Sequence, residues 1–212
     1  MKASALHFAP LLVALAAVAL PAAETRRHGD LRIPDTLKPG QTAPDFRLRT
    51  VDGAAEVQLS DYRGKQPVIL VFGSYTCPPF REHVGTLESL FDRYRDRVAF
   101  HMVYIKEAHP SDGWAMARNQ RQGIALKDAA TLAERAAAAQ TACTTLKIKL
   151  PCLVDGMDNA TNQAYAAWPD RIYVIDAAGK VAVMGATGPA GFAPSVKATR
   201  AWLERSFPPP AR

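Results

Sequence analysis

The chain has 212 residues, 48% of them hydrophobic, which is enough for one α/β domain with a substantial core and short flanking segments. Its 26 Lys and Arg against 20 Asp and Glu give a net charge of +6, but the basic residues are scattered and not interleaved with aromatic residues. This pattern disfavours nucleic acid as a partner. The chain also has no internal repeat and no glycine-rich phosphate loop, which removes nucleotide binding as a default.

The N-terminus has the order of segments that is typical of an export signal. Lys2 provides the positive start, residues 11–20 are apolar, and small residues follow up to Ala23. We therefore expect residues 1–23 to be a signal peptide and the protein to be periplasmic or secreted. The alternative is an uncleaved membrane anchor, because residues 3–23 are nearly long enough to span a bilayer.

The expected domain, residues 38–207, lies between two short flanks. Residues 24–37 are polar and charged and predict a linker, and residues 208–212 form a proline-rich tail. Inside the domain, the alternating residues 45–49 and 57–60 predict an antiparallel hairpin.

The chain is organised around residues 68–80. An apolar, β-branched run predicts a buried strand, and a short polar turn then leads to Cys77, which is followed by two prolines that can begin a helix. The free N–H groups and positive end of a helix favour a thiolate at this position. We interpret Cys77 as a reactive thiol, although free cysteines are more often buried as small apolar side chains.

A βαβ unit follows from the residues on either side of this cysteine. Apolar residues after Cys77 recur at helical spacing, and residues 98–105 predict the next strand. The two strands are therefore expected to be parallel neighbours joined by a right-handed crossover. Because sites in open parallel sheets lie at the carboxyl ends of strands, Cys77 and the loop at residues 107–114 are expected to meet.

The second half of the domain is predicted to contain helices and strands in alternation. The expected elements are a helix at 128–140, a strand-like run at 150–155, a short helix at 159–167, an antiparallel hairpin from 171–176 and 181–184, and a closing helix around Trp202.

This layout resembles the thioredoxin-like fold, a three-layer α/β sandwich in which helices flank a mixed sheet. Residues 42–46 (Thr-Ala-Pro-Asp-Phe) and 174–180 (Val-Ile-Asp-Ala-Ala-Gly-Lys) resemble the redoxin branch of that fold. The hairpin, the cysteine after the first strand of the βαβ unit and the final hairpin with its helix carry the likeness.

Three further segments resemble the iodothyronine deiodinases. They are residues 72–80, residues 104–114 with the run Ala-His-Pro-Ser-Asp-Gly-Trp at its end, and residues 165–173. The similarity covers residues 38–207. In that family the position of Cys77 is commonly selenocysteine.

The resemblance implies a set of site residues. The implied catalytic residues are Cys77 as the attacking atom, Thr76 in its pocket, and Glu107 with His109 as a proton-handling pair. The implied substrate-binding residues are Tyr104 and Arg171. The family also implies no cofactor, no metal, an external thiol reductant and the option of a homodimer.

This sequence departs from the family in ways that bear on its substrate. A cysteine in place of selenocysteine should slow attack on iodine, and Tyr75 stands where animal relatives often have a cysteine. A second histidine, which animal enzymes use to recognise thyroid hormone, is absent near Gly123. The chemistry is therefore expected to be retained without the thyroid substrate.

Three cysteines, Cys77, Cys143 and Cys152, cannot all pair within one chain. Phe80 occupies the second cysteine position of a Cys-x-x-Cys motif, so a thioredoxin-type disulfide reductase is excluded. Either Cys152 or Cys143 resolves oxidised Cys77, or the two form a structural disulfide. Loop closure allows both outcomes.

Three functions remain to be compared. The first is reductive dehalogenation of an iodinated aromatic, in which His109, oriented by Glu107, supplies the proton. The second is a redoxin-type thiol peroxidase acting on peroxide, favoured by Ser74 three residues before Cys77. The third is a non-enzymatic metal-binding protein, which needs a second cysteine where Arg81 stands. In the two enzymatic cases a thiol donor protein or small thiol would reset the sulfur.

Overall fold

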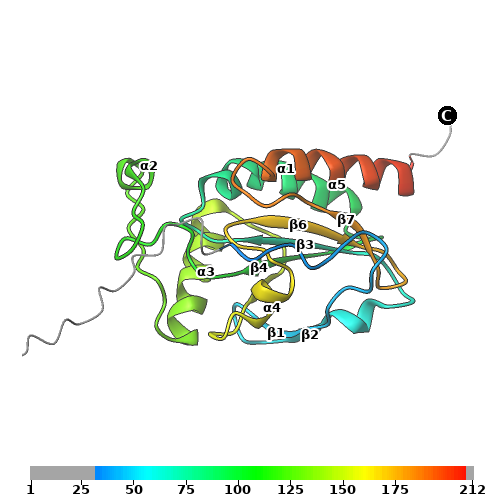
Figure 1. Ribbon diagram of the computed structural model, residues 1–212, viewed down its shortest axis with the longest axis horizontal. Helices are drawn as coiled ribbons and strands as arrows, with labels where there is room; N and C mark the ends of the chain where they lie inside the picture. Colours follow the sequence, from blue (N-terminus) through cyan, green and yellow to red (C-terminus); the bar gives the residue numbers. More distant parts are fainter. Residues whose placement is uncertain (1–31, 209–212) are drawn as a thin grey trace, which may run out of the picture.

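A seven-stranded mixed sheet forms the middle of the domain in the computed structural model, which describes residues 32–208 (Figure 1). The strands occur in the order β2-β1-β5-β4-β3-β6-β7. Their bounds are β1 Arg47–Thr50, β2 Glu56–Gln58, β3 Val68–Gly73, β4 Ala99–Tyr104, β5 Cys152–Val154, β6 Arg171–Ile175 and β7 Val181–Met184. The predicted signal peptide lies outside the described residues.

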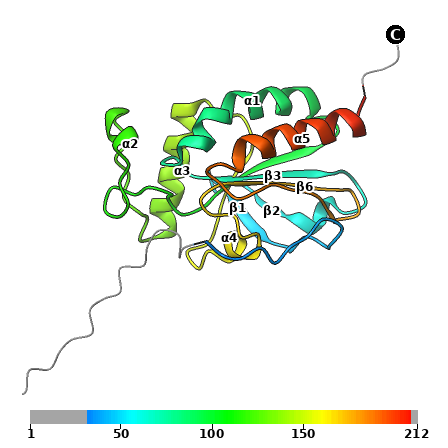
Figure 2. The same cartoon turned by 45° about the horizontal axis from the view of Figure 1, so that its top comes forward.

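Helices cover both faces of this sheet. The helices of the described residues are the 3₁₀ helix η2 Leu59–Tyr62, α1 Pro78–Tyr94, α2 Ala117–Arg121, α3 Leu132–Leu146, α4 Ala160–Ala164 and α5 Phe192–Ser206. Figure 2 shows α1 and α5 together on one face and α4 on the other, whereas α2 sits on an arm that projects from the body. The prediction of a mixed sheet flanked by helices is therefore confirmed.

The central strand β3 is buried on both faces, which explains its unbroken apolar sequence. Successive side chains of a strand point to opposite faces, so Ile69 and Val71 join the core beneath α1 and α5. Leu70 and Phe72 enter a second core on the face of α4. Every β3 residue is buried, and the strand fixes the position of the turn that follows it.

The neighbours of β3 determine which segments meet at its carboxyl end. β4 pairs with it in parallel, with Gly73 opposite Tyr104, as the βαβ prediction requires. β6 pairs with it antiparallel, with Phe72 opposite Arg171. The turn after β3, the loop after β4 and the segment before β6 therefore converge at one edge.

The other predicted elements are present, with shifted bounds where local interactions decide them. β1 and β2, and β6 and β7, form the expected antiparallel pairs. The helix predicted at residues 128–140 starts later, because Thr131 and Glu134 form a capping box. It ends at left-handed Lys147, which places Cys143 in its last turn.

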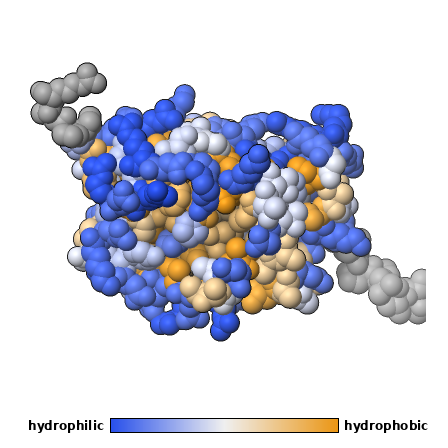
Figure 3. Space-filling model, turned by 180° about the vertical axis from the view of Figure 1, so that it is seen from behind, coloured by the Kyte–Doolittle hydropathy of each residue, from blue (hydrophilic) through white to orange (hydrophobic). Residues whose placement is uncertain are grey.

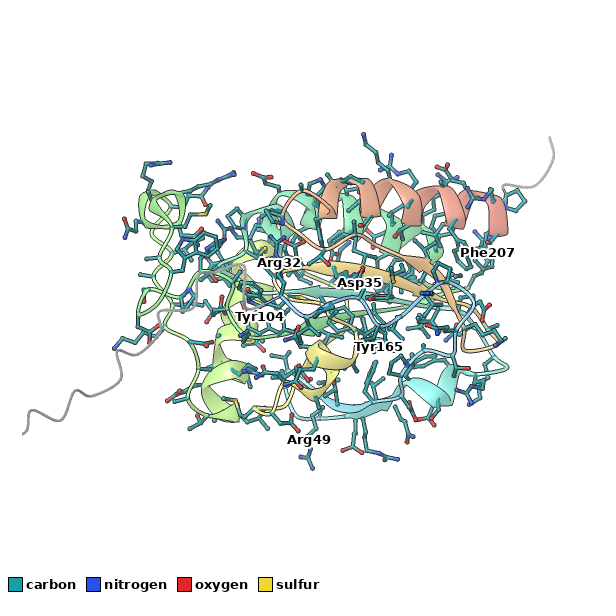
Figure 4. All side chains as sticks on the ribbon, viewed as in Figure 1. Arg32, Asp35, Arg49, Tyr104, Tyr165 and Phe207 are labelled. Carbon is teal, nitrogen blue, oxygen red and sulfur yellow. The ribbon has the colours of Figure 1, made fainter. Side chains whose placement is uncertain are left out.

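The described part of the predicted linker, residues 32–37, makes specific contacts with the domain. Asp35 Oδ1 accepts a hydrogen bond of 2.6 Å from Arg171 Nη1, and Leu37 packs on the core beside α4. Arg32 and Asp35 lie at the level of the central sheet (Figure 4). This segment therefore does more than tether the domain, because the buried Arg171 needs its negative charge.

On the face seen in Figure 3, hydrophilic residues surround a middle region in which apolar residues show. Within residues 32–208, the exposed large apolar side chains are Ile33, Trp114 and Leu132. Among these same residues, no helix combines the length and the apolar character needed to cross a bilayer.

We expect Gly73→Ala to destabilise the domain, because the last residue of β3 touches the first turn of α1. A Cβ at Gly73 would lie 2.7 Å from two atoms of the Phe80 ring, which is itself buried. Overpacking of this kind costs about 1–3 kcal/mol of unfolding free energy. Urea denaturation measures the loss.

The matched control is Gly85→Ala, in the middle of α1, where a Cβ would meet nothing. It should stabilise the protein by about 1 kcal/mol through helix propensity. Equal effects of the two substitutions would contradict this account of the β3–α1 contact.

Candidate active site

Cys77 is the N-cap residue of α1, as predicted, and Pro78 and Pro79 form the first helical positions. Its side chain is only 1% exposed. The sulfur does not cap the helix; Sγ instead donates a hydrogen bond of 2.8 Å to Asp170 Oδ2. Asp170 immediately precedes β6, and the antiparallel pairing of β6 with β3 brings it to the cysteine.

The charge beside the sulfur changes the protonation expected for Cys77. Burial, and then the carboxylate of Asp170, raise the pKa of the Cys77 thiol well above its usual value. Burial also raises the pKa of Asp170 to about 6, although Arg32 and His83 act in the opposite direction. The expectation that the helix terminus would favour a thiolate is therefore wrong for the resting state, because desolvation and a neighbouring carboxylate outweigh it.

A buried hydrogen-bond network lies directly behind the cysteine. Thr76 donates to Glu107 Oε2 through its backbone N–H, at 2.9 Å, and through its hydroxyl, at 2.5 Å. Tyr104 OH donates to the other oxygen of Glu107. The backbone N–H of His109 in turn donates to Thr76 Oγ1 at 3.0 Å. Thr76 therefore joins the two members of the predicted Glu107 and His109 pair.

This network determines the state of the Glu107 carboxyl. Burial raises the pKa of Glu107, and the hydrogen bonds from Thr76 and Tyr104 oppose that change. Burial, with the negative charge of Glu107, also raises the pKa of Tyr104 well above its usual value. Tyr104 thus lies near the pair, as expected, as a hydrogen-bond donor to Glu107.

Cys77 and His109 line one pocket of about 270 Å³. The rings of His109 and Trp114 meet edge to face, with their centroids 4.2 Å apart. The other lining residues are Arg32, Pro78, Pro79, Glu82, Trp114, Met116, Arg118, Trp168, Pro169 and Pro189. The pocket is therefore walled mainly by aromatic and apolar side chains, the usual character of a small-molecule site.

The pocket draws its walls from segments far apart in the chain. Trp114, Met116 and Arg118 come from the projecting arm that carries α2, and Trp168 comes from the loop before β6. Arg118 forms an ion pair with Glu82 of α1. The guanidinium of Arg32 is the second positive group of the lining.

The predicted role of Arg171 in binding substrate needs correction. Its side chain is fully buried and is absent from the pocket lining. The guanidinium donates to Asp35 and to the carbonyl oxygens of Gly185 and Ala166. It therefore holds the segments around β6 together, because these donors are committed inside the protein. Tyr104 is likewise behind the pocket wall and outside its lining.

The turn that carries Cys77 is held by two residues that sequence reasoning did not include. Asn119 Nδ2, on the projecting arm, donates to the Thr76 carbonyl oxygen at 2.8 Å. Arg81 donates to the Tyr75 carbonyl oxygen at 2.6 Å and to Asn119 Oδ1 at 2.7 Å. These bonds fix the arm against the start of α1, and so complete the pocket.

The other two cysteines lie next to each other. Cys143 is on α3 and Cys152 on β5, two elements that pack against each other, and each thiol shifts the pKa of the other. The sulfur of Cys77 is bonded to Asp170 instead. Within residues 32–208, no group of three or more His, Cys, Asp or Glu side chains is arranged to hold a metal ion.

Asp170, Arg32, Arg118 and Trp168 were not identified from the sequence as site residues. Asp170 does fall inside the segment 165–173, where the resemblance was noticed, next to Arg171. Nothing in the spacing indicates that its carboxyl reaches a sulfur so far away in sequence.

The fold and the site together define a thioredoxin-like protein with a single cysteine at the start of the first helix. Two solved structures share the fold. A putative protein disulfide isomerase from Bacteroides thetaiotaomicron aligns with 80% of this chain and 92% of its own, at a TM-score of 0.55 and 20% identity. The thioredoxin domain of a thiol-disulfide oxidoreductase from Bacteroides vulgatus aligns with 77% and 99%, at a TM-score of 0.51 and 16% identity.

The chain belongs to the iodothyronine deiodinase family, whose family model matches residues 25–207. The thyroxine 5-deiodinase of Gallus gallus is 36% identical over 167 residues, which cover 78% of this chain and 62% of the relative. The chain thus spans between 52% and 62% of the length of the deiodinases compared with it.

We expect Asp170→Asn to change stability in a pH-dependent way. A carboxyl whose pKa rises from 3.8 to about 6 on folding destabilises the folded state only when it is charged. The penalty is therefore absent near pH 3, grows as the pH rises and is complete above pH 6. Asp170→Asn should gain stability relative to wild type over this range, by at most about 3 kcal/mol. Urea titrations at several pH values measure it.

The control is Asp52→Asn, at an exposed carboxylate. Its hydrogen bonds from Thr50 and Ala54 lower the pKa of Asp52, so the substitution should lose stability at neutral pH relative to acid pH. A stability difference for Asp170→Asn that does not change with pH would contradict the assignment of a raised carboxyl pKa.

Proposed function

We propose that this protein is a thiol-dependent oxidoreductase that removes iodine reductively from an iodinated aromatic compound. The observation that carries the proposal is that Cys77 and His109 line the same aromatic-walled pocket. Membership of the iodothyronine deiodinase family supports the same chemistry.

The reaction begins when the Cys77 thiol transfers its proton to Asp170, which accepts its hydrogen bond. The thiolate then attacks iodine, so that an S–I bond forms as the C–I bond breaks. The aryl carbon takes the electron pair of the broken bond, and His109 supplies it with a proton. Glu107 and Thr76 position His109, because the backbone N–H of His109 donates to the Thr76 hydroxyl and that hydroxyl donates to Glu107.

Two external thiols complete the cycle. The first attacks the sulfur of the sulfenyl iodide, releases iodide and leaves a mixed disulfide on Cys77. The second reduces this disulfide and restores the thiol. The overall change is Ar–I plus two RSH giving Ar–H, HI and RSSR, so no cofactor takes part.

The pocket also suggests which aromatic compounds fit. Trp114 and Trp168 provide aromatic walls for an aryl group, and a substituent bearing negative charge would be attracted by Arg32, because Glu82 already pairs with Arg118. We therefore propose a single iodinated ring with an anionic substituent, such as an iodophenol bearing a carboxylate.

The peroxidase alternative gains no support from the geometry of Ser74. Its hydroxyl is fully buried and accepts a hydrogen bond of 3.1 Å from the backbone N–H of Ala108. It holds the two site loops together and does not line the pocket. Peroxide consumption nevertheless distinguishes the peroxidase from the dehalogenase.

We propose that the protein works after export, in the periplasm or outside the cell, with a small thiol or a thiol protein as donor. The order of charge, apolar run and small residues in residues 1–23 supports export.

The purified protein with a thiol reductant should release iodide from an iodinated phenol, and Cys77→Ser should abolish that release. The serine hydroxyl cannot form the S–I bond. Iodide is measured directly alongside peroxide consumption in parallel samples. Rapid peroxide turnover without any iodide release would refute dehalogenation and favour the peroxidase.

His109→Ala should lower iodide release about 100-fold or more, the usual contribution of a positioned proton donor. It should change the alkylation rate of Cys77 by iodoacetamide much less, because alkylation needs no proton on carbon. His101→Gln, at a histidine of β4 that bonds to Tyr62 outside the pocket lining, is the control. Equal losses in both assays for His109→Ala would mean that this residue only tunes the thiol.

A further inference from the structure

The cysteines that the dehalogenation mechanism leaves unused are neighbours in space. Cys143 lies in the last turn of α3 and Cys152 is the first residue of β5, and α3 packs against β5. Cys143 packs against the core cluster that contains Cys152, and Cys152 Sγ donates a long hydrogen bond of 3.9 Å to the Leu153 carbonyl oxygen. The two cysteines are therefore neighbours before any covalent bond forms.

The loop between these cysteines is held in place on both sides. Lys147 ends α3 in the left-handed conformation, and the N–H of Ile148 donates to the carbonyl oxygen of Cys143 at 2.9 Å. Glu88 of α1 accepts hydrogen bonds from the N–H groups of Lys149 and Leu150, at 2.9 Å and 3.2 Å. The loop thus holds the end of α3 and the start of β5 beside each other without a covalent bond between the cysteines.

The two thiols differ in accessibility. Cys143 is half-buried, whereas Cys152 is only 5% exposed. The interaction between the two thiols lowers the pKa of Cys143, and the same interaction together with burial raises the pKa of Cys152. The more accessible sulfur is therefore also the better thiolate, as a first attacking group requires.

We propose that Cys143 and Cys152 form an intramolecular disulfide by exchange with a small disulfide such as oxidised glutathione, which leaves Cys77 as the single free thiol. Cys143 thiolate attacks the small disulfide, forms a mixed disulfide and releases one thiolate. Cys152 then loses its proton and attacks Cys143 Sγ, releasing the second thiolate. One small disulfide is reduced to two thiols as the two cysteines are oxidised to one disulfide.

If Cys143 and Cys152 are paired, neither of them can reduce oxidised Cys77. Of the whole inference, only this point rests on the proposed dehalogenase function. Cys152 belongs to β5, which is separated from β3 by β4, and Cys77 follows β3. Adjacent strands lie about 4.8 Å apart, so two strand spacings separate β5 from the strand that leads to Cys77. With both remaining cysteines joined to each other, oxidised Cys77 is reset by a thiol from outside the chain.

The test begins with Cys77→Ser, which leaves only these two cysteines. The protein is incubated with oxidised glutathione, denatured, alkylated with iodoacetamide and analysed by mass spectrometry. The expected product has lost two hydrogens, carries no alkyl group, and yields a linked pair of peptides containing residues 143 and 152. Reduction before alkylation should restore two alkylation sites.

A double variant and a melting measurement support the peptide analysis. Cys77→Ser with Cys143→Ser should remain alkylated or glutathionylated at Cys152 and give no linked peptide. The oxidised protein with both cysteines should melt several degrees higher than its reduced form, a shift that Cys143→Ser removes. Alkylation of both cysteines after oxidation, or stable glutathione adducts on both, would overturn the proposal.

The wild-type protein distinguishes a Cys143–Cys152 disulfide from one that includes Cys77. After oxidation it should take up one alkyl group, at Cys77, and a linked peptide joining Cys77 to Cys143 or Cys152 as the main product would overturn the pairing. Cys143→Ala with Cys152→Ala should retain iodide release when thiol is supplied, and its loss from a normally folded variant would refute the external reset. If wild type releases no iodide at all, dehalogenation fails while the peptide map still decides the disulfide.

Discussion

The site depends on the pairing of β3 with a parallel strand on one side and an antiparallel strand on the other. The parallel strand β4 delivers the loop with Glu107 and His109 to the carboxyl end of β3. The antiparallel strand β6 begins at the same edge and delivers Asp170 from the opposite direction. The cysteine after β3 is therefore enclosed by groups from both neighbours. Burial of β3 on both faces holds this arrangement, since its alternate side chains pack into the two cores on either side of the sheet.

The surroundings of Cys77 favour the thiol form of the sulfur and place a carboxyl group beside it, which the proposed mechanism uses as a base. An ionised Asp170 beside a buried sulfur opposes a second negative charge, yet it is also the group that accepts the sulfur's hydrogen bond. The raised pKa of Asp170, about 6, makes it a better proton acceptor than an ordinary aspartate would be. The same desolvation that favours proton transfer destabilises the folded protein at neutral pH, a compromise common at functional sites.

The projecting arm and the segment at residues 32–37 add a specific pocket to this common fold. Asn119 and Arg81 fasten the arm to the turn before α1, so that Trp114 stands over His109. Residues 32–37 supply Arg32 to the pocket and Asp35 to the buried Arg171. Selectivity would thus be decided by segments outside the central sheet, as is usual for sites built on a rigid scaffold.

Local patterns in the sequence determined the order of strands and helices, the position of Cys77 at a helix start, and the meeting of its turn with the loop at 107–114. Such features depend on apolar periodicity and on strand connection rules, which act over short stretches of chain. Tertiary structure alone decided that Asp170 contacts the sulfur, that Arg171 is a buried structural cation, and that Cys143 faces Cys152. Each of these depends on which segments become neighbours across the sheet and on how much water is excluded there. The protonation of Cys77 belongs with them, because burial and a charge more than ninety residues away in the chain outweigh the helix end that the sequence shows.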